Sequence, residues 1–492
     1  MNRRDFIKTT AIAGAGWLIL PSGTLRGQNA PSNKLNLALI GSWGRGEAHF
    51  SSLATQNLVA LCDINEDHLA FGAKKFPNAK TYVDWRKLLD DHKKLGLDGV
   101  VACTADHTHA FIANWCLNRD LHCYMEKPIA ISVEEARTVR ANWMKKKGKL
   151  ASQVGMQRHA QQNFNRVREL IRDGAIGDLT AAYAWGNRQV RPSGCDYDQE
   201  KGIVYFKNKD GKPVAGYLPD YGEPPKGLHY DLWLGPSPAH PYNPGYFGLG
   251  PGMNCLSWNM FWDFGAGQIG DMGSHTMDLC WNALDATLPT SFEAKGDTYN
   301  DAITPIRCES HFELPANNWR GPIRVSWYQG RVMPPSPKKY IDLKEIDHGA
   351  MYKGTKGYII CSFGDRIVVP FGDDADFTYY KPRKKEDTLP PLGHFQEQWL
   401  NACKNPSLKT ACDFEYSANM IEMMLLGLVA YRVGNEVYEE VRDEKTHKVI
   451  GKAKRRVSKK LQYDSVNGKV TNCPEANQYL SRQYRQGWAL NG

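Results

Sequence analysis

Apolar runs alternate with helix-like stretches from Lys34 to about Met156. Each run is three to five residues long and mainly apolar, and a longer amphipathic segment separates it from the next. Strands that are apolar on both faces are typical of a parallel sheet covered by helices on both sides. The pattern predicts strands over 37–40, 58–62, 99–103, 123–125 and 153–156, and helices over 49–55, 66–75, 110–118 and 134–147.

The pattern changes beyond about Gln157. A predicted helix over 165–172 precedes a long irregular stretch, about 188–259, that is rich in Pro, Gly, Tyr and Trp. Long loops in compact enzymes are commonly functional. Strand-like segments then follow one another without helices between them, which favours an antiparallel or mixed sheet. These segments are 291–294, 306–312, 323–328 and 357–369, and helices are predicted after them over 395–403 and 415–432.

The two patterns predict an α/β protein with two domains. The parallel-sheet domain covers 31–156, and an α+β domain with a large, mostly antiparallel open sheet covers 157–492. A chain of 492 residues, of which 42% are hydrophobic, can bury the core that both domains need. The tail, 470–492, is rich in Tyr, Arg and Asn and is expected to pack back on the body of the protein.

Residues 1–30 are expected to act as an export signal. Arg3 and Arg4 precede an apolar stretch, 11–21, which is the pattern of a twin-arginine signal peptide. Cleavage is expected near residue 30, which predicts a periplasmic or otherwise exported protein. The apolar stretch is too short to span a bilayer comfortably, and retention of the uncleaved signal as a membrane anchor stays open.

Charge and cysteine content narrow the function classes. The formal net charge of +9 falls to +6 without residues 1–30, because that segment holds four basic residues and one acidic residue. Such an ordinary surface indicates no nucleic-acid partner. The basic cluster at 452–460 has acidic neighbours, so a solvated loop or hairpin is expected there. The twelve cysteines stand singly with no C-x-x-C pair, and buried thiols are a simpler interpretation than disulfides.

A glycine turn follows the first predicted strand. A dinucleotide pyrophosphate needs a tight turn, bare backbone and a helix N-terminus with free N–H groups. The expected spacing is G-x-G-x-x-G, and Gly41 and Gly46 occupy its outer positions. Trp43 stands at the middle position, and Gly44 comes one residue late. These residues and Arg45 are expected beside the cofactor, with Trp43 covering it and slowing its release.

A carboxylate at the end of the second strand supports the same interpretation. Asp63 follows the strand 58–62 and lies 22 residues after Gly41. There it can accept hydrogen bonds from both adenosine ribose hydroxyls and repel a 2′-phosphate, which predicts NAD rather than NADP. The alternative is that Asp63 caps a helix starting at Glu66. Turn and carboxylate together predict a Rossmann NAD-binding domain over 31–156.

Motifs further along the chain resemble one family. Glu126-Lys127-Pro128 ends a predicted strand after a T-A-D-H-T-H loop at 104–109. This combination resembles the Gfo/Idh/MocA superfamily of glucose–fructose oxidoreductases and inositol dehydrogenases. A proline commonly follows the loop threonine in that family, and Ala105 stands there instead. The resemblance continues in V-G-M-Q-R at 154–158, L-W-L-G-P at 232–236, F-W-D-F-G at 261–265, G-D-M-G-S-H at 270–275 and Y-R-Q-G-W at 484–488.

The resemblance implies a catalytic group of Lys127, Asp271 and His275. Oxidation of an alcohol needs a base for the hydroxyl proton while hydride leaves the carbon, and an imidazole suits that task near neutral pH. Lys127 is expected to hydrogen-bond the same oxygen. Asp271 is expected on the same helix face as His275, where it orients the ring or binds substrate. The structural alternatives are a surface lysine, a helix N-cap and a core histidine.

The resemblance also implies the contacts around this group. On the cofactor side these are Thr104, His107, His109, Glu126 on the nicotinamide ribose, and Gln157 at the nicotinamide end. Charged and aromatic groups suited to a sugar are Arg158, Arg188, Tyr230, Trp262 and His275. Packing is an equally open role for Trp233 and Trp262. His107 and His109 have no Cys or carboxylate at ligand spacing, so no metal is expected.

The sequence therefore predicts an NAD-dependent oxidoreductase that moves hydride between a sugar, polyol or glycoside and a tightly bound nicotinamide. An alternative within the family is a redox-neutral glycosidase that oxidises its substrate transiently and eliminates the aglycone. That group lacks the lysine of Glu-Lys-Pro, so Lys127 favours plain dehydrogenation without excluding elimination. A non-catalytic NAD-binding protein is disfavoured by the complete catalytic group. The expected partners are a small carbohydrate and further copies of the chain, in a homodimer or tetramer.

Overall fold

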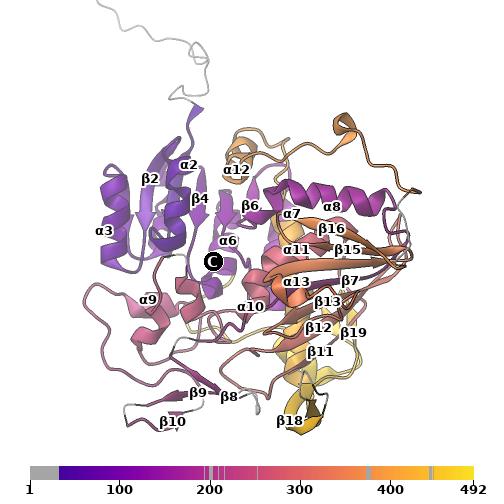
Figure 1. Cartoon of the computed structure of the whole chain (residues 1–492). Helices are drawn as coiled ribbons and strands as arrows, with labels where there is room; N and C mark the ends of the chain where they lie inside the picture. The colour runs from indigo at the N-terminus through magenta and orange to yellow at the C-terminus, as the bar shows by residue number, and fades with distance from the viewer. Residues whose placement is uncertain are drawn as a thin grey trace, which may run out of the picture.

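The computed structural model describes residues 33–492 apart from short gaps (Figure 1). The residues outside the description are 1–32, 193, 199–202, 209, 215, 252, 373–377, 443–445 and 447. The export signal predicted at 1–30 therefore lies outside the described residues. Within the described part, no helix has the length and apolar character needed to cross a membrane.

The first domain is a parallel six-stranded sheet in the order β3-β2-β1-β4-β5-β6. This order is the doubly wound Rossmann arrangement. Its strands are β1 Asn36–Ile40, β2 Asn57–Cys62, β3 Lys80–Tyr82, β4 Gly99–Ala102, β5 His122–Met125 and β6 Ser152–Val154. Its helices are η2 Gly44–His49, α2 Phe50–Leu53, α3 Glu66–Lys75, α4 Trp85–Asp90, α5 His92–Leu95, α6 Asp106–Asn118 and α7 Val133–Lys146. The prediction missed β3, because three largely exposed residues carry no apolar signal.

The second domain is built on an eleven-stranded sheet in which β7 and β13 are parallel and the other paired strands are antiparallel. Its strands are β7 Leu179–Gly186, β11 Ser291–Gly296, β12 Cys308–Leu314, β13 Ile323–Gln329, β14 His348–Gly354, β15 Gly357–Cys361, β16 Arg366–Pro370, β17 Asn435–Arg442, β18 Val449–Val457, β19 Leu461–Asp464 and β20 Lys469–Val470. The predicted mostly antiparallel open sheet is confirmed. The single strand predicted over 357–369 is wrong, because a turn at 362–365 splits it in two.

Helices cover one face of this sheet and join it to the first domain (Figure 1). They are η3 Gln157–Ala160, α8 Gln162–Arg172, α10 Gly267–Gly270, α11 Met272–Leu284, α12 Phe395–Lys404 and α13 Phe414–Val433. Helix α13 packs against α7 on one side and against β11 and β12 on the other. Its apolar composition matches its nearly continuous burial. A buried helix between two sheets fixes the orientation of one domain relative to the other.

The segment predicted as irregular over 188–259 contains regular structure. It forms a small sheet of β8 Asp196–Asp198, β9 Ile203–Lys207 and β10 Pro213–Val214, followed by α9 Tyr230–Leu234, η4 Pro244–Phe247 and η5 Asn254–Ser257. The strands are too short to give a period-2 signal. Figure 1 shows α9 below the Rossmann sheet, and the backbone joins it there, because His229 N–H donates to the Ile64 carbonyl at 2.8 Å. This segment therefore closes the carboxyl edge of the parallel sheet.

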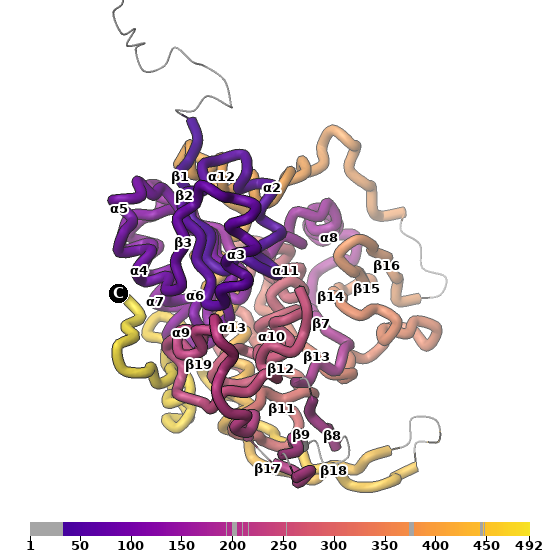
Figure 2. Tube along the Cα trace, turned by 90° about the vertical axis from the view of Figure 1, so that its left-hand side faces the viewer, coloured from indigo at the N-terminus to yellow at the C-terminus, as the bar shows by residue number. Residues whose placement is uncertain are grey.

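The C-terminal part holds a hairpin and a tail. The basic cluster lies in the β17–β18 hairpin, which projects from the body (Figure 2), and the hairpin interpretation is confirmed. The tail runs back to the first domain, where the indole of Trp488 packs on Trp85 and Trp115 Nε1 donates to the Ala489 carbonyl at 3.0 Å. All twelve cysteines are free thiols, as predicted.

Candidate active site

The carboxyl ends of four neighbouring parallel strands bring the predicted residues together. Gly41 follows β1, Thr104 follows β4 after Cys103, Lys127 follows β5 after Glu126, and Gln157 comes shortly after β6. Ligands of open α/β sheets bind at this edge. The α9 segment and the start of α11 face the same edge from the second domain (Figure 1).

The glycine turn has the geometry that a pyrophosphate site needs. Gly41 has φ +86°, and a Cβ there would lie 2.5 Å from the Cys103 carbonyl oxygen. A Cβ on Gly46 would lie 2.1 Å from the Gly41 carbonyl oxygen. Gly44 is also left-handed, at φ +62°, whereas Trp43 is extended. The late glycine therefore carries the strained position and leaves Trp43 free to hold a side chain, which stacks on His68 at 4.2 Å.

Asp63 belongs to the turn and not to the following helix. Its carboxylate accepts hydrogen bonds from Ser42 N–H at 2.9 Å and from Asn65 N–H at 3.0 Å. Helix α3 is capped by Asn65 instead, whose side chain accepts from Asp67 N–H. The N-cap alternative for Asp63 is therefore wrong. Burial raises the pKa of this carboxyl above its usual value, and the two N–H groups oppose that shift.

A cavity of about 300 Å³ opens beside Asp63. Rossmann residues form one wall and the 225–258 segment forms the other. The walls include Gly41, Trp43, Asp63, Thr104, Leu228, Tyr242 and Trp258. Nearby, Arg45 Nη2 and Gln157 Oε1 are buried without a hydrogen-bond partner. A bare glycine turn, a ribose-type carboxylate and unpaired polar atoms at the same sheet edge fit a bound dinucleotide.

Glu126 is held as a buried carboxylate. Arg45 Nε and His49 Nε2 lie 2.8 and 2.9 Å from its Oε1 atom. Burial opposes the charge, but Arg45 and His49 outweigh it and hold the pKa of Glu126 at about 2. A Cβ on Gly155 would meet the same carboxylate at 2.3 Å. Glu126 thus ties the glycine-turn helix to β5 and β6 next to Lys127.

Lys127 and Asp271 form an ion pair between the two domains. Burial disfavours the ammonium charge, but the Asp271 carboxylate outweighs burial and raises the pKa of Lys127. Asp271 stands at the N-terminus of α11 without capping it through its side chain. The surface-lysine and N-cap alternatives therefore fail. Within the part of the chain that the structure describes, the carboxylate contacts Lys127 and has no hydrogen bond to the His275 ring, so the structure does not support its expected role in orienting that ring.

His275 is a buried, neutral imidazole close to this pair. It is 5% exposed, and burial together with the Lys127 charge lowers its pKa to about 3. Its Nδ1 atom has no hydrogen-bond partner. A satisfied core histidine has both nitrogens occupied, so the third alternative fails as well. An unprotonated imidazole next to a protonated lysine can take a proton from a hydroxyl that the lysine also contacts.

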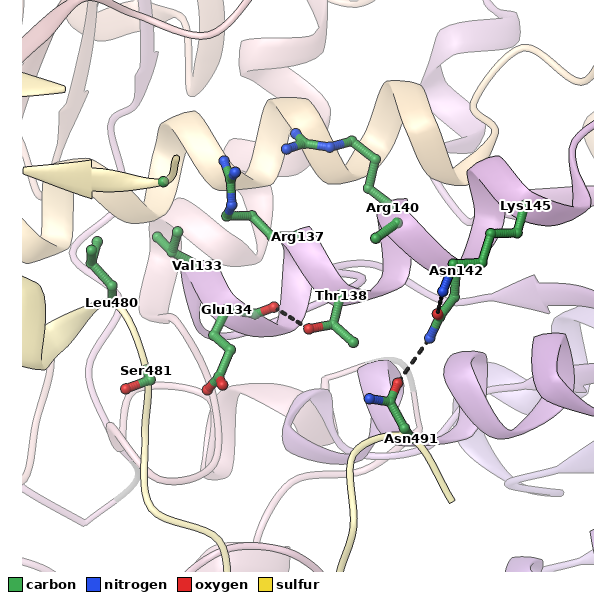
Figure 3. Close-up of a pocket in the computed structure, with 12 residues that line it drawn as sticks. Val133, Glu134, Arg137, Thr138, Arg140, Asn142, Lys145, Leu480, Ser481 and Asn491 are labelled. Carbon is green, nitrogen blue, oxygen red and sulfur yellow. Dashed lines mark hydrogen bonds between the residues drawn. The ribbon is translucent and has the colours of Figure 1, made fainter. Parts of the chain in front are cut away.

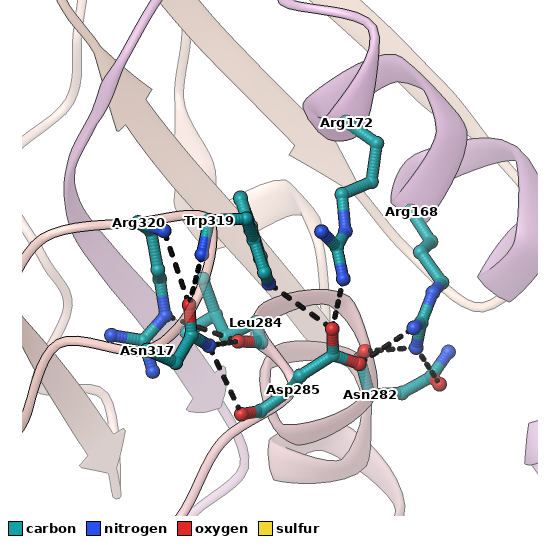
Figure 4. Close-up of polar contacts among 8 residues, drawn as sticks. All are labelled: Arg168, Arg172, Asn282, Leu284, Asp285, Asn317, Trp319 and Arg320. Carbon is teal, nitrogen blue, oxygen red and sulfur yellow. Dashed lines mark hydrogen bonds and ion pairs between the residues drawn. The ribbon is translucent and has the colours of Figure 1, made fainter.

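The far end of α11 is fixed by a polar cluster (Figure 4). Asp285, at φ +44°, follows the last turn of the helix. Arg168 Nη2 and Trp319 Nε1 donate to its carboxylate at 2.6 and 3.1 Å, and Arg172 pairs with it from α8. Asp278, one turn after His275, accepts from Tyr416 and pairs with His159 at 2.8 Å. The helix that carries His275 is thus held against α8, η3 and α13.

A second cleft, of about 560 Å³, is lined by residues of η3, α11, β14, β15 and β16. Its lining includes Arg158, Arg188, Met272, His348, Phe363 and Arg366. The Phe363 ring lies edge-on to the His275 ring at a centroid distance of 6.4 Å. Arg188 is paired with Asp347 at 2.7 Å and is 60% exposed. The cleft therefore adjoins the catalytic candidates on the side where substrate is expected.

Two histidines expected at the cofactor have other partners. His107 Nε2 lies 2.8 Å from the Trp233 carbonyl and Nδ1 lies 3.3 Å from the Phe264 carbonyl. His109 bridges the Pro128 and Thr104 carbonyls at 2.7 and 3.0 Å. Burial lowers the pKa of both rings, so each is neutral and can donate to only one of its two neighbouring carbonyls. The expected contact of these histidines with the cofactor stays a prediction. They connect the loop after β4 to the second domain and to Pro128.

Two residues expected at the substrate make packing contacts outside the second cleft. Tyr230 is buried in an aromatic cluster against Trp233, and its hydroxyl donates to the Pro241 carbonyl at 3.0 Å. Trp262 donates to the Asn300 carbonyl at 2.9 Å and stacks on Tyr431. The 560 Å³ cleft contains neither side chain. Packing is therefore the role of both tryptophans left open above, Trp233 and Trp262.

Four residues near the site were missed by the sequence analysis. Asp106 is a buried carboxyl whose pKa is raised by burial, although Lys127 opposes the shift. Burial and Asp271 raise the pKa of Cys255 to about 12, so the thiol is neutral. His348 and Phe363 line the second cleft. Asp106 stood within the quoted loop, but the other three carry no local signal, because only the fold brings β14, the β15–β16 turn and η5 to the site.

A groove of about 620 Å³ between α7 and the C-terminal tail is separate from these residues (Figure 3). Its arginines, Arg137 and Arg140, pair with the fully buried Glu422 at 2.8 and 2.7 Å. Asn142 donates to Asn491 of the tail at 2.8 Å. The groove contains none of the candidate site residues, and its charges hold α7, α13 and the tail together.

Comparison with known proteins identifies the two domains that form this site. The model of the oxidoreductase family with an NAD-binding Rossmann fold, GFO_IDH_MocA, matches residues 35–155, and the model of the family's C-terminal alpha/beta domain matches 218–311. A myo-inositol 2-dehydrogenase of Thermotoga maritima is 26% identical over 176 residues, covering 35% of this chain and 51% of that protein. Glycosyl hydrolase family 109 protein 2 of Akkermansia muciniphila is 29% identical over 174 residues, covering 32% and 36%. The chain thus spans about half or less of these relatives' length.

The fold is also shared with solved structures. The WlbA dehydrogenase of Bordetella pertussis, in complex with NADH and UDP-GlcNAcA, aligns over 81% of this chain and 96% of its own with a TM-score of 0.53 and 15% identity. Such a likeness shows the fold. Together with the two matched family domains, the glycine turn and Asp63 establish an NAD-binding Rossmann domain followed by an α/β domain. Over residues 35–155 and 218–311, the chain matches the two domain models of the Gfo/Idh/MocA oxidoreductase family.

Proposed function

We propose that the protein is an NAD-dependent dehydrogenase that oxidises a hydroxyl-bearing carbon of a sugar or polyol. The observation that carries the proposal is the Lys127–Asp271 ion pair beside the neutral, unpartnered His275. These groups meet at the carboxyl edge of the NAD-binding sheet, next to a cleft that is lined by Met272 and Phe363. The inositol dehydrogenase among the relatives supports a polyol substrate.

In the proposed reaction, NAD supplies the hydride acceptor when it is bound. Lys127 donates a hydrogen bond to the substrate hydroxyl oxygen and stabilises the negative charge that develops on that atom. His275 receives the hydroxyl proton as the carbon loses hydride, and so ends the step as an imidazolium. Asp271 keeps Lys127 charged and in place. The low pKa of His275 ensures that the ring is unprotonated when substrate arrives.

The test is a turnover assay on residues 31–492 with NAD and a panel of sugars, inositols and aryl glycosides. We expect the reduced-nicotinamide absorbance to grow with the wild-type protein. The rate of this growth should fall by about 10²–10⁴-fold in His275→Ala. Arg383→Gln, which removes a surface ion pair with Asp173, serves as the control. Glycoside cleavage without net formation of NADH would favour the alternative function, a redox-neutral glycosidase that oxidises its substrate transiently. Absence of turnover on the whole panel would contradict both.

We further propose that the chain retains its cofactor. Trp43 and the 225–258 segment wall the adenosine side of the site, and Glu66 N–H donates to the Gly227 carbonyl across the two domains at 2.9 Å. A cofactor can leave only if this contact or the Trp43 ring moves. We expect wild-type protein to keep bound NAD through dialysis and Trp43→Gly to lose it. Equal retention by both would remove the role of Trp43.

We propose export through the twin-arginine route from the pattern at 1–30. This route carries proteins that are already folded, which suits an enzyme that must bind its cofactor first and that keeps free thiols. Cell fractionation of the full chain should place the protein outside the cytoplasm, with cytoplasmic accumulation when Arg3 and Arg4 are both replaced by Lys. A carbonate wash of the membranes decides whether an uncleaved form stays anchored.

A further inference from the structure

The cleft beside His275 contains a cation without a counter-charge. Among the described residues, no carboxylate lies within 4.0 Å of the Arg158 guanidinium. Its Nη1 atom donates to the Gln161 side-chain oxygen at 3.1 Å, and its carbon lies 5.3 Å from the centroid of the Phe363 ring. Arg188, in the same cleft, is by contrast paired with Asp347. Arg158 therefore keeps most of its donors for a ligand.

Arg158 faces the reacting side of the cleft. Its positive charge contributes to lowering the pKa of both His275 and His348, after burial in each case. His348 stacks on Phe363 at 6.4 Å, and its Nε2 atom is buried without a hydrogen-bond partner. A guanidinium and an unpaired ring nitrogen thus line the same cleft, and each lies against Phe363, whose ring also faces His275.

The position of Arg158 is fixed by its neighbour. His159 Nδ1 lies 2.8 Å from Asp278, and Asp278 is on α11 one turn after His275. Tyr416 donates to the same carboxylate. One buried polar group therefore sets the spacing between η3, which carries Arg158, and the helix that carries His275. Such anchoring pre-organises a charged contact and reduces its entropic cost.

We infer that the substrate of the proposed dehydrogenase carries a carboxylate, which binds Arg158 and the Nε2 atom of His348. This inference rests on the proposed function and names its substrate class as uronic acids or their glycosides. A planar carboxylate matches the fork of a guanidinium, and charge-assisted hydrogen bonds are about twice as strong as neutral ones. Glu345, Asp347 and Asp365 line the outer cleft. They disfavour a phosphate dianion more than a singly charged carboxylate.

The test uses matched substrates that differ only at one carbon. Methyl β-D-glucoside and methyl β-D-glucuronide, and glucose and glucuronate, are assayed with NAD, and glucose 6-phosphate serves as the phosphate arm. We expect kcat/KM for the acids to exceed that for the neutral partners at least tenfold. Arg158→Gln should lower kcat/KM for the acids by about 10–100-fold, the value of a charge-assisted hydrogen bond, and for neutral sugars by less than threefold. Arg383→Gln, whose guanidinium pairs with Asp173 outside the cleft, should stay within threefold for both.

The outcomes separate the inference from the proposed function. Oxidation of neutral sugars without preference for acids, or equal losses for both series in Arg158→Gln, overturns the inference alone. Preference for the phosphate over the acids also overturns it. If nothing is oxidised, the proposed function fails, and the inference is then decided by calorimetric binding of methyl glucuronide to the NAD-loaded wild type and Arg158→Gln. Equal affinity in that measurement overturns it.

Discussion

The cofactor end and the substrate end of this protein are built in opposite ways. At the cofactor end, both carboxylates have partners within the chain, because Asp63 accepts from two backbone N–H groups and Glu126 contacts Arg45 and His49. The atoms without a partner there are Arg45 Nη2 and Gln157 Oε1, which belong to no carboxylate or imidazole. At the substrate end, His275 Nδ1 and His348 Nε2 lack partners inside the protein. The cofactor end is also covered by the second domain, whereas the substrate cleft is open. This difference supports the proposal that the site keeps its cofactor and exchanges its substrate.

The largest effect is expected where the two ends meet, at Lys127. Lys127→Ala removes the cation beside the reacting oxygen and leaves Asp271 buried without its partner. We expect kcat to fall by about 10³-fold, while the amount of NAD that copurifies stays within twofold of wild type. Stopped-flow absorbance and nucleotide analysis after denaturation measure the two quantities. Loss of NAD together with activity would mean that the two ends do not act independently. Asp271→Asn removes the charge of the other member of the ion pair and tests the same independence.

A smaller effect is expected at the cofactor end alone. Asp63→Asn removes the charge that repels a 2′-phosphate, while the amide oxygen keeps one acceptor for the turn. The ratio of Kd values for NADP and NAD should fall by about tenfold or more, with little change in substrate KM. The ratio is informative because a general loss of folding affects both Kd values equally. An unchanged ratio would show that Asp63 serves only the Ser42 and Asn65 N–H groups.

The same contrast explains what the sequence could predict. The glycine turn and Asp63 were recognisable because backbone geometry imposes residue types at fixed spacing: a Cβ on Gly46 would lie 2.1 Å from another backbone oxygen. The parallel strands were recognisable because they are apolar on both faces. The role of the displaced Gly44, by contrast, could not be predicted from the sequence. Its positive φ angle shows that it takes a strained position in the turn beside Trp43.

The substrate end was only partly predictable. Lys127, Asp271 and His275 came from resemblance to a family, and the structure brings them together. Tyr230 and Trp262 were misassigned, because an aromatic residue in a functional-looking loop has the same sequence signal whether it packs or binds. His348 was missed because its strand, β14, pairs with β7 across 160 residues of chain, a contact that no local pattern encodes.

Acid should weaken the protein through the histidines at both ends. Burial lowers the pKa of His107 and of His275 to about 3, whereas an unfolded histidine titrates near 6.5. Between those values the unfolded state binds protons that the folded state excludes, so stability falls as pH falls from 6.5 toward 3. Each histidine should cost about 1 kcal/mol between pH 7 and 5.5. Urea unfolding at the two pH values measures the loss of unfolding free energy. His107→Gln should reduce this loss by about 1 kcal/mol, the contribution of one histidine. An unchanged loss would contradict burial of a neutral His107 ring. The kcat profile should show no acid limb near 6.5.

The smallest effect is expected at the anchor of the catalytic helix. Asp285→Asn keeps a residue that tolerates φ +44° but removes the charge that pairs with Arg168 and Arg172. Because Asp285 is partly exposed, we expect a loss of about 1 kcal/mol in unfolding free energy and less than a threefold change in kcat. Asp120→Asn is the matched control, since Asp120 also has positive φ and pairs with Lys146 away from α11. If Asp285→Asn lowers kcat strongly while Asp120→Asn does not, the position of His275 depends on this distant end of α11. The substrate end would then rely on contacts far from the cleft, which would weaken the contrast with the cofactor end.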